Sequence, residues 1–164
     1  MLTDPANAAL FTREELAIIR AHVPWTRVLA DEEVDKDEWH GPLLDLAHAW
    51  REHLVLKPND EYGGTGVMLG WEQSEADWTA AIDRALTDPW GTWVVQERIP
   101  IRRETFPQFD ASGHVTMNDM LVDLAPYLFR GKMGGYLTRL SGSGLANVTS
   151  GGGQVPAFVI GDHG

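Results

Sequence analysis

The segment LVLKPNDEYGGTGV, residues 54–67, brings a lysine, acidic residues and three glycines close together. Glycine lets backbone N–H groups approach phosphate oxygens because it carries no Cβ, and a lysine at a strand end supplies a compact positive charge. Carboxylates beside the glycines would repel phosphate unless a divalent cation bridges the two, as Mg²⁺ does with one or two carboxylates. The combination predicts a clamp for a magnesium-bound nucleotide, formed by Lys57, Glu61, Gly63, Gly64 and Gly66.

The same segment also has the features of an ordinary hairpin. A strand, a proline and a pair of glycines are typical of a wide turn, so the residue types alone leave both interpretations open. Neither common phosphate-binding fingerprint is present, because no Gly-Lys-Ser/Thr follows the glycines and strand-forming residues, not a helix, come next. The six histidines show no metal-binding spacing.

The first half of the chain alternates predicted helices with predicted strands. Helices are expected to begin at the capping pair of Thr12 and Glu15, after Gly41-Pro42, and at Ser74. Their apolar residues recur at helical spacing, which indicates one buried face for each helix. The acidic run at residues 31–39 is predicted to be a solvated loop.

The second half has the pattern of antiparallel strands. Predicted strands cover residues 92–101 and 104–109, and a long pair over residues 119–140 turns near Gly131. The stretch SGSGLANVTSGGG is predicted to be a loop, and AFVI, residues 157–160, a last strand. The chain is therefore predicted to be an α+β domain with two lobes joined near residues 95 to 100.

Composition narrows the classes of function. With 164 residues and 43% hydrophobic content, the chain is long and apolar enough for a globular core. It has no apolar run near the roughly 20 residues of a membrane helix and no signal peptide pattern. The lack of cysteine excludes disulfides and thiolate chemistry, so we expect a cytoplasmic protein. A net charge of −11 without a basic cluster argues against nucleic acid as a partner, and we expect no membrane partner either.

The ordered motifs resemble the ATP-grasp superfamily. They are LVLKPNDEYGGTGV, then WVVQERI, then LVDLAPYLFRGKMGGYLTRLSG and ANVTSGGG. They are most similar to the circularly permuted branch, which includes glutathionylspermidine synthetase and eukaryotic-type glutathione synthetase. HVPWTR, residues 22–27, also resembles the segment upstream of the lysine strand in that branch. The resemblance covers roughly residues 54–160.

The resemblance implies a fold and an activity. Residues 1–53 would be a helical lead-in to an ATP-grasp nucleotide-binding region over residues 54–164. That region would have an N-lobe at about 54–95 and a C-lobe at about 100–164. The implied activity is that of an ATP-dependent carboxylate–amine ligase, which uses ATP and Mg²⁺ and acts through an acyl-phosphate.

The resemblance also implies roles for single residues. Lys57 would contact the nucleotide phosphates and Glu61 would ligate Mg²⁺, under a lid formed by the three glycines. Residues 96–99 would be the hinge between the lobes. Their backbone would bind adenine, and Glu97 would be the acidic residue of the hinge. These hinge residues are Gln96, Glu97, Arg98 and Ile99.

Further roles fall in the second half. Asp123 would face the ribose or the metal, and Arg139 would act with Lys57 in catalysis by facing the γ-phosphate or the acyl-phosphate. The residues alone leave alternatives open. Asp123 would reach solvent if it alternates to the outer face of its strand, and Arg139 would equally pair with a surface carboxylate. Asn147 is the candidate for a further metal ligand.

The chain departs from the family pattern in two ways. A second phosphate-binding lysine is expected upstream, but Lys36 is the sole lysine there and its acidic surroundings make it a poor candidate. The acceptor-binding domain and further metal ligands are also missing. We therefore expect the ATP-binding part of a longer enzyme, completed by a partner chain or an N-terminal domain. Two alternatives remain, a nucleotide-binding or regulatory module without turnover and a plain α+β interaction domain.

Overall fold

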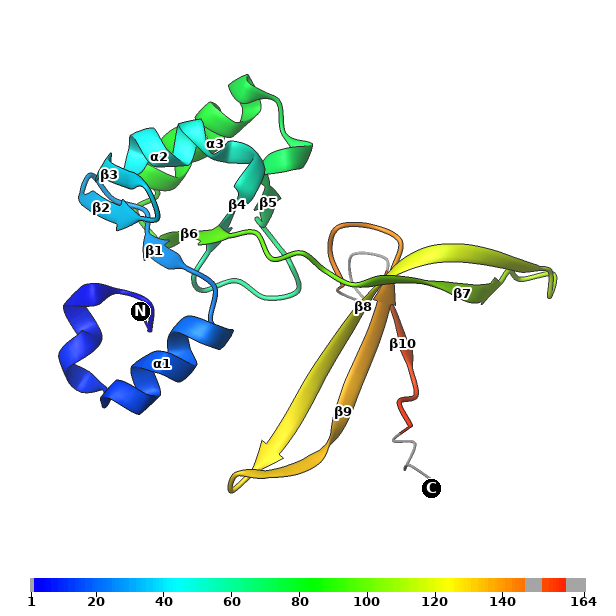
Figure 1. The fold of residues 1–164 in the computed structure, drawn as a ribbon. Coiled ribbons are helices and arrows are strands. Elements are labelled where there is room, and N and C mark those ends of the chain that lie inside the picture. The colour runs from blue at the N-terminus through cyan, green and yellow to red at the C-terminus, as the bar shows by residue number, and fades with distance from the viewer. Residues whose placement is uncertain (1, 147–151, 159–164) are drawn as a thin grey trace. The chain divides into compact units, whose positions relative to one another are not determined.

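The computed structural model describes residues 2–146 and 152–158. The chain divides into two compact units, Met1–Ile99 and Pro100–Gly164, which are described separately (Figure 1). Both contain antiparallel sheets, and the first also contains helices, which confirms the predicted α+β class. In the described part of the chain, no helix is both long enough and apolar enough to cross a membrane.

A four-stranded sheet organises the first unit. Its order is β1-β6-β4-β5, and every neighbouring pair is antiparallel. The two inner strands, β6 and β4, therefore each pair on both sides. The strands are β1 Thr26–Val28, β4 Leu54–Pro58, β5 Met68–Leu69 and β6 Trp93–Glu97.

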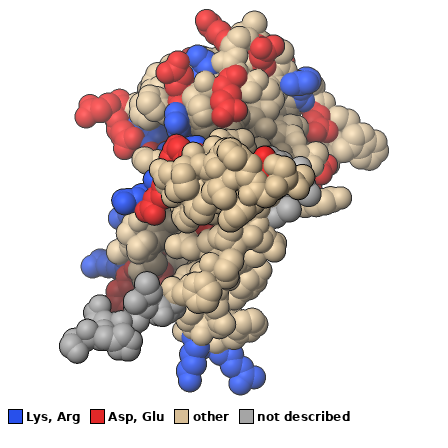
Figure 2. All heavy atoms as spheres, turned by 90° about the vertical axis from the view of Figure 1, so that its right-hand side faces the viewer, with Lys and Arg blue, Asp and Glu red and all other residues tan. Residues whose placement is uncertain are grey.

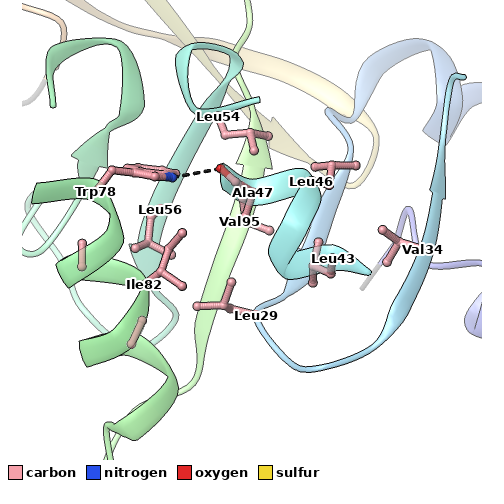
Figure 3. Close-up of a cluster of buried hydrophobic side chains, with 12 residues drawn as sticks. Leu29, Val34, Leu43, Leu46, Ala47, Leu54, Leu56, Trp78, Ile82 and Val95 are labelled. Carbon is pink, nitrogen blue, oxygen red and sulfur yellow. Dashed lines mark hydrogen bonds between the residues drawn. The ribbon is translucent and has the colours of Figure 1, made fainter. Parts of the chain in front are cut away.

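Two helices, α2 Leu43–Ala49 and α3 Glu75–Thr87, cover one face of this sheet (Figure 1). Strand alternation directs Leu54, Leu56 and Val95 to that face, where all three are fully buried. The indole Nε1 of Trp78 donates a hydrogen bond of 2.9 Å to the carbonyl of Ala47, which links the two helices (Figure 3). The helices and strands therefore close one apolar core, which includes Leu29, Val34, Leu43, Leu46, Ala47, Leu54, Leu56, Trp78, Ala81, Ile82, Ala85 and Val95.

Local capping signals set the starts of two helices. Helix α1 spans Arg13–His22, and Thr12 and Glu15 form the predicted capping box. Helix α3 begins after Ser74, whose hydroxyl accepts a hydrogen bond of 3.1 Å from a backbone N–H in the first turn. Short 3-10 helices complete the unit at Pro5–Leu10, Arg51–His53 and Gly70–Glu72.

The acidic run is a hairpin, so the prediction of a solvated loop is wrong. Strands β2 Glu33–Lys36 and β3 Trp39–Pro42 pair antiparallel. Val34 and Lys36 point inward and are buried, while the intervening carboxylates point outward. The alternation has the period of a strand, and the density of charge obscured it. Residues 1–53, predicted as a helical lead-in, therefore contain this hairpin and β1 in addition to helices.

The second unit is a four-stranded antiparallel sheet of order β10-β9-β8-β7. Its long hairpin turns at Arg130 and Gly131, both with positive φ, as a two-residue turn between twisted strands requires. The predicted last strand is wrong in part. The strand ends at Val155, Phe158 lies beyond it, and the remaining two predicted residues lie outside the described ones. The bounds are β7 Arg103–Phe109, β8 Val115–Phe129, β9 Lys132–Ser141 and β10 Gly153–Val155.

No helix lies in the described residues of this second unit. Large apolar side chains remain exposed on its strands, and the side seen in Figure 2 is largely uncharged there. They include Phe109, Val115, Met117, Leu124, Tyr127, Leu128, Phe129, Met133 and Tyr136.

Candidate functional site

A cavity of about 520 Å³ lies against the sheet of the first unit. Lys57 stands opposite Val94 in the register, and Thr26 stands opposite Gln96. Because opposed residues share a face and the pattern repeats every second residue, these four side chains lie on the face away from α2 and α3. The full lining is Leu2, Thr3, Val23, Thr26, Lys57, Pro58, Asn59, Glu61, Gly64, Thr65, Val67, Val94 and Gln96.

The ammonium group of Lys57 is held by a neutral partner. Its Nζ donates to Oε1 of Gln96 at 2.9 Å, and Nε2 of Gln96 donates to the Thr26 hydroxyl at 2.8 Å. That hydroxyl in turn donates to the carbonyl of Pro24 at 3.0 Å. Among the residues that the structure describes, Lys57 forms no ion pair with a carboxylate. Lys57 therefore presents an uncompensated positive charge at the cavity.

The three glycines of the loop lie in the left-handed region of backbone conformation. Gly63, Gly64 and Gly66 all have positive φ, between 69° and 80°. At Gly66 an added Cβ would also lie 3.0 Å from Cγ of Pro58, so this position disfavours any side chain on two grounds. Gly64 reaches the cavity lining together with Glu61. The predicted residues Lys57, Glu61, Gly64 and Gln96 are thus brought together in one place.

The predicted hinge is divided between two environments. Gln96 lines the cavity, whereas the next three residues are absent from its lining. The backbone N–H of Glu97 donates to the carbonyl of Trp25 and that of Arg98 to the carbonyl of His53, both at 2.8 Å. Ile99 is half exposed. Two of the donors that the resemblance assigns to adenine are therefore engaged within the protein.

Lys36 lines a second cavity of about 400 Å³, which shares no lining residue with the first. Its Nζ lies 3.0 Å from Oδ2 of Asp37 and 3.3 Å from Oε2 of Glu97. It also lies over the rings of Trp25 and Trp50, 5.6 and 5.4 Å from their centroids. This lysine is buried and its charge is matched, in contrast to Lys57. The inward position of Lys36 in the hairpin alternation was the available signal, and the sequence prediction missed it.

The N-terminal residues form one wall of the 520 Å³ cavity, which the sequence prediction also missed. The Thr3 hydroxyl donates to the carbonyl of Thr26 at 3.0 Å and accepts from its N–H at 3.0 Å. The buried guanidinium of Arg27 donates to the carbonyl of Thr3 at 2.8 Å. Burial lowers the pKa of Arg27, partly offset by the nearby carboxylates of Asp4 and Glu32. Arg27 therefore anchors this wall from the far side of β1.

In the second unit, Asp123 and Arg139 pair with each other. They stand opposite on β8 and β9, and Nη2 of Arg139 lies 2.6 Å from Oδ2 of Asp123. The resemblance implied a ligand contact for each of these residues, and pairing of Arg139 with a carboxylate was the alternative. The structure shows the paired arrangement, in which the two opposite charges neutralise each other. Asn147 lies outside the described residues. Residues 2–146 and 152–158 contain no group of three or more His, Asp or Glu side chains that could hold a metal ion.

Comparisons with known proteins give one distant relative. No family model matches the chain, and no solved structure matches it. The chain is 30% identical over 135 residues to an uncharacterized protein of Mycobacterium leprae (strain TN). The alignment covers 77% of this chain and 22% of the relative, so the chain spans about a fifth of the length of the curated relative it matches.

Proposed function

We propose that the chain is the Mg-ATP-binding part of an ATP-grasp type carboxylate–amine ligase. In that reaction a carboxylate takes a phosphoryl group from ATP, and an amine then displaces the phosphate to form an amide bond. The observation that carries the proposal is the uncompensated ammonium of Lys57 at a cavity bordered by a glycine loop. A free cation is unexpected in a unit this acidic unless an anion binds there.

The cavity lining fits a nucleotide. Lys57 would attract the phosphates, and the backbone of Gly64 is accessible to them without a Cβ in the way. Val67 and Val94 supply an apolar surface for a base. For Mg²⁺ the lining offers the carboxylate of Glu61, in keeping with an ion that takes most of its ligands from phosphate and water. Mg²⁺, when bound, adds positive charge beside the phosphates.

The charges favour binding over turnover by this chain alone. Phosphoryl transfer requires several cations around the transferred group. The guanidinium of Arg139 is matched by Asp123, and Lys36 is matched by Asp37 and Glu97. We infer that a partner chain or a further domain supplies the remaining charges and binds the carboxylate and amine substrates. The same observation favours the second candidate, a nucleotide-binding or regulatory module without turnover.

The remaining partners follow from composition. A cysteine-free sequence suits the reducing cytoplasm, which we propose as the location. The absence of a Lys/Arg cluster in an acidic sequence argues that nucleic acid is not a partner.

Thermal unfolding with and without Mg-ATP tests the proposal. A ligand that binds the folded chain adds RT ln(1 + [L]/Kd), or about 2.7 kcal/mol at a hundredfold excess over Kd. ADP should stabilise less, because it lacks the γ-phosphate. A melting temperature that does not respond to millimolar Mg-ATP would refute the nucleotide site. If binding is found, ADP release with a panel of amino acids, short peptides and amines separates the ligase from the module without turnover.

A further inference from the structure

The hydrogen bonds beside Lys57 have only one possible direction. An ammonium group donates and cannot accept, so Gln96 must turn its oxygen to Lys57. Its NH₂ group then faces Thr26, whose hydroxyl must accept from Gln96 and donate to the carbonyl of Pro24. In this series of hydrogen bonds, each donor faces an acceptor. The amide of Gln96 is thereby fixed in orientation by the backbone of the segment before β1.

We propose that Gln96 is the positioning residue for Lys57. It fixes the ammonium at the cavity and, being neutral, leaves the positive charge available to a phosphate group. This inference rests on the proposed nucleotide site and adds to it the residue that sets the strength of the phosphate contact. Gln96 acts through Lys57 and need not touch the ligand.

The two lysines of the first unit show why neutrality matters. Lys36 is fixed by carboxylates, so a phosphate would have to compete with Asp37 and Glu97 for its charge. Lys57 is fixed just as closely, at 2.9 Å, but by an amide. At such distances a carboxylate offsets much of the positive charge that a phosphate would meet, whereas a neutral amide leaves that charge available. The identity of the group that holds a lysine thus decides whether it can bind an anion.

The isosteric variant Gln96→Glu separates this role from a purely structural one. It keeps the shape and the bond from Lys57 but cancels the charge of the ammonium. Lys57 and Glu61 are the other titratable groups that line the cavity among the described residues, since the N-terminal segment and β1 contribute Leu2, Thr3 and Thr26 there. At neutral pH we expect Gln96→Glu to lower the affinity for Mg-ATP by about tenfold or more. Gln73→Glu is the matched control, because it adds the same charge to the same unit outside the cavity lining.

Because the chain has three lysines, NMR can detect the contact between Lys57 and Gln96 in the absence of ligand. Lysine labelled at Cε and Nζ gives one NMR signal each for Lys36, Lys57 and Lys132, which Lys→Arg variants assign. Lys132 is exposed in the second unit and serves as the free reference. In Gln96→Leu we expect the Lys57 signal to move to the position of Lys132. In Gln96→Glu we expect the Lys57 signal to stay distinct from that of Lys132, because a carboxylate then faces the ammonium and keeps it in place.

The outcomes separate the two claims. Loss of affinity in Gln96→Glu but not in Gln73→Glu, with a shifted Lys57 signal, supports the positioning role. Equal affinity in the parent and Gln96→Glu overturns it and leaves the nucleotide site standing. A Lys57 signal that already matches Lys132 in the parent overturns it without reference to any ligand. A parent chain that does not bind Mg-ATP removes the nucleotide site and, with it, the role proposed for Gln96.

Discussion

The two units of the molecule deal with charge and apolar surface in opposite ways. Residues 100–164 contain five Lys or Arg and five Asp or Glu, so the whole net charge of −11 belongs to residues 1–99. All seven tryptophans are in the first unit as well. That unit buries its apolar residues between a sheet and two helices, whereas the strands of the second leave large apolar side chains exposed. We therefore expect the buried core to contribute more to stability in the first unit, and strand pairing to contribute more in the second.

The comparison extends to how the cations are used. In the second unit, Arg103 pairs across strands with Asp119 and Arg139 with Asp123, each at 2.6 Å. In the first unit Lys57 instead donates a hydrogen bond to the neutral amide of Gln96, although this unit carries many acidic residues. Cross-strand ion pairs are an ordinary means of holding strands in register. Lys57 forms no such cross-strand ion pair among the described residues, and this is the basis for proposing that its charge serves a ligand.

The largest expected effect is a loss of stability on substitution of a residue in the buried core of the first unit. Leu56 is fully buried, so Leu56→Ala should lower the free energy of unfolding of the first unit by about 2–5 kcal/mol. Leu128 is 63% exposed in the second unit, and Leu128→Ala should change stability by no more than about 0.5 kcal/mol. Urea unfolding followed by tryptophan fluorescence reports on the first unit alone, and far-UV circular dichroism adds the second. Similar losses in both variants would contradict the contrast between the units.

Local signals in the sequence predicted the elements that depend on local chemistry. The capping box at Thr12 and the cap at Ser74 start helices where expected. The turn near Gly131 is where a glycine after Arg130 allows two residues with positive φ.

The contacts that make the site depend on register, which the sequence does not show. Gln96 meets Lys57 because β6 pairs with β4 from 39 residues away, and a shift of one residue would turn either side chain to the core. β1 was missed as a strand because three residues are too few to show a period. The buried position of Lys36 was missed because it points inward while the acidic residues beside it in the sequence point outward.

The two lysines of the first unit provide the next test. Lys57→Met should weaken Mg-ATP binding by about tenfold or more, with a stability change below about 1 kcal/mol, because its partner Gln96 remains within reach of water in the cavity. Lys36→Met should leave Mg-ATP affinity nearly unchanged and lower the stability of the fold. It removes a cation from two tryptophan faces and should cost about 1–2 kcal/mol of stability. Fluorescence-detected unfolding and calorimetric titration measure both quantities, and equal effects on affinity would contradict the assignment of Lys57.

A smaller effect is expected from the acidic residue of the loop. Glu61→Gln should reduce the gain in ATP affinity on adding Mg²⁺ and leave metal-free ATP binding unchanged or slightly stronger, because a negative charge is removed from the cavity lining. Glu72→Gln is the matched control in the same unit, outside that lining. Titrations with and without Mg²⁺ give the coupling. If the two variants show the same Mg²⁺ dependence as the parent, Glu61 is not a metal ligand.

The smallest effect is a pH dependence that we expect from one carboxyl in each unit, Asp88 and Asp110. The Trp93 indole N–H, at 2.8 Å, and the backbone N–H of Trp90 hold the pKa of Asp88 below its ordinary value. In the second unit the Ser112 hydroxyl, at 2.6 Å, and the backbone N–H of His114 do the same for Asp110. A carboxyl with a lowered folded-state pKa stabilises the fold above its unfolded pKa of about 3.9, and this contribution is lost as the pH falls through the folded value.

The two carboxyls can be read out separately because only the first unit contains tryptophan. On acidification below about pH 4, the fluorescence should change as Asp88 releases Trp93, and Asp88→Asn should abolish this change while Asp110→Asn preserves it. The backbone amide of His114 should follow the reverse pattern in NMR spectra, because its acceptor is Asp110. A fluorescence change that persists in Asp88→Asn would mean that another acid-sensitive contact reaches the tryptophans. Loss of both signals in either variant would show that the units titrate together, and the separation drawn between them would fail.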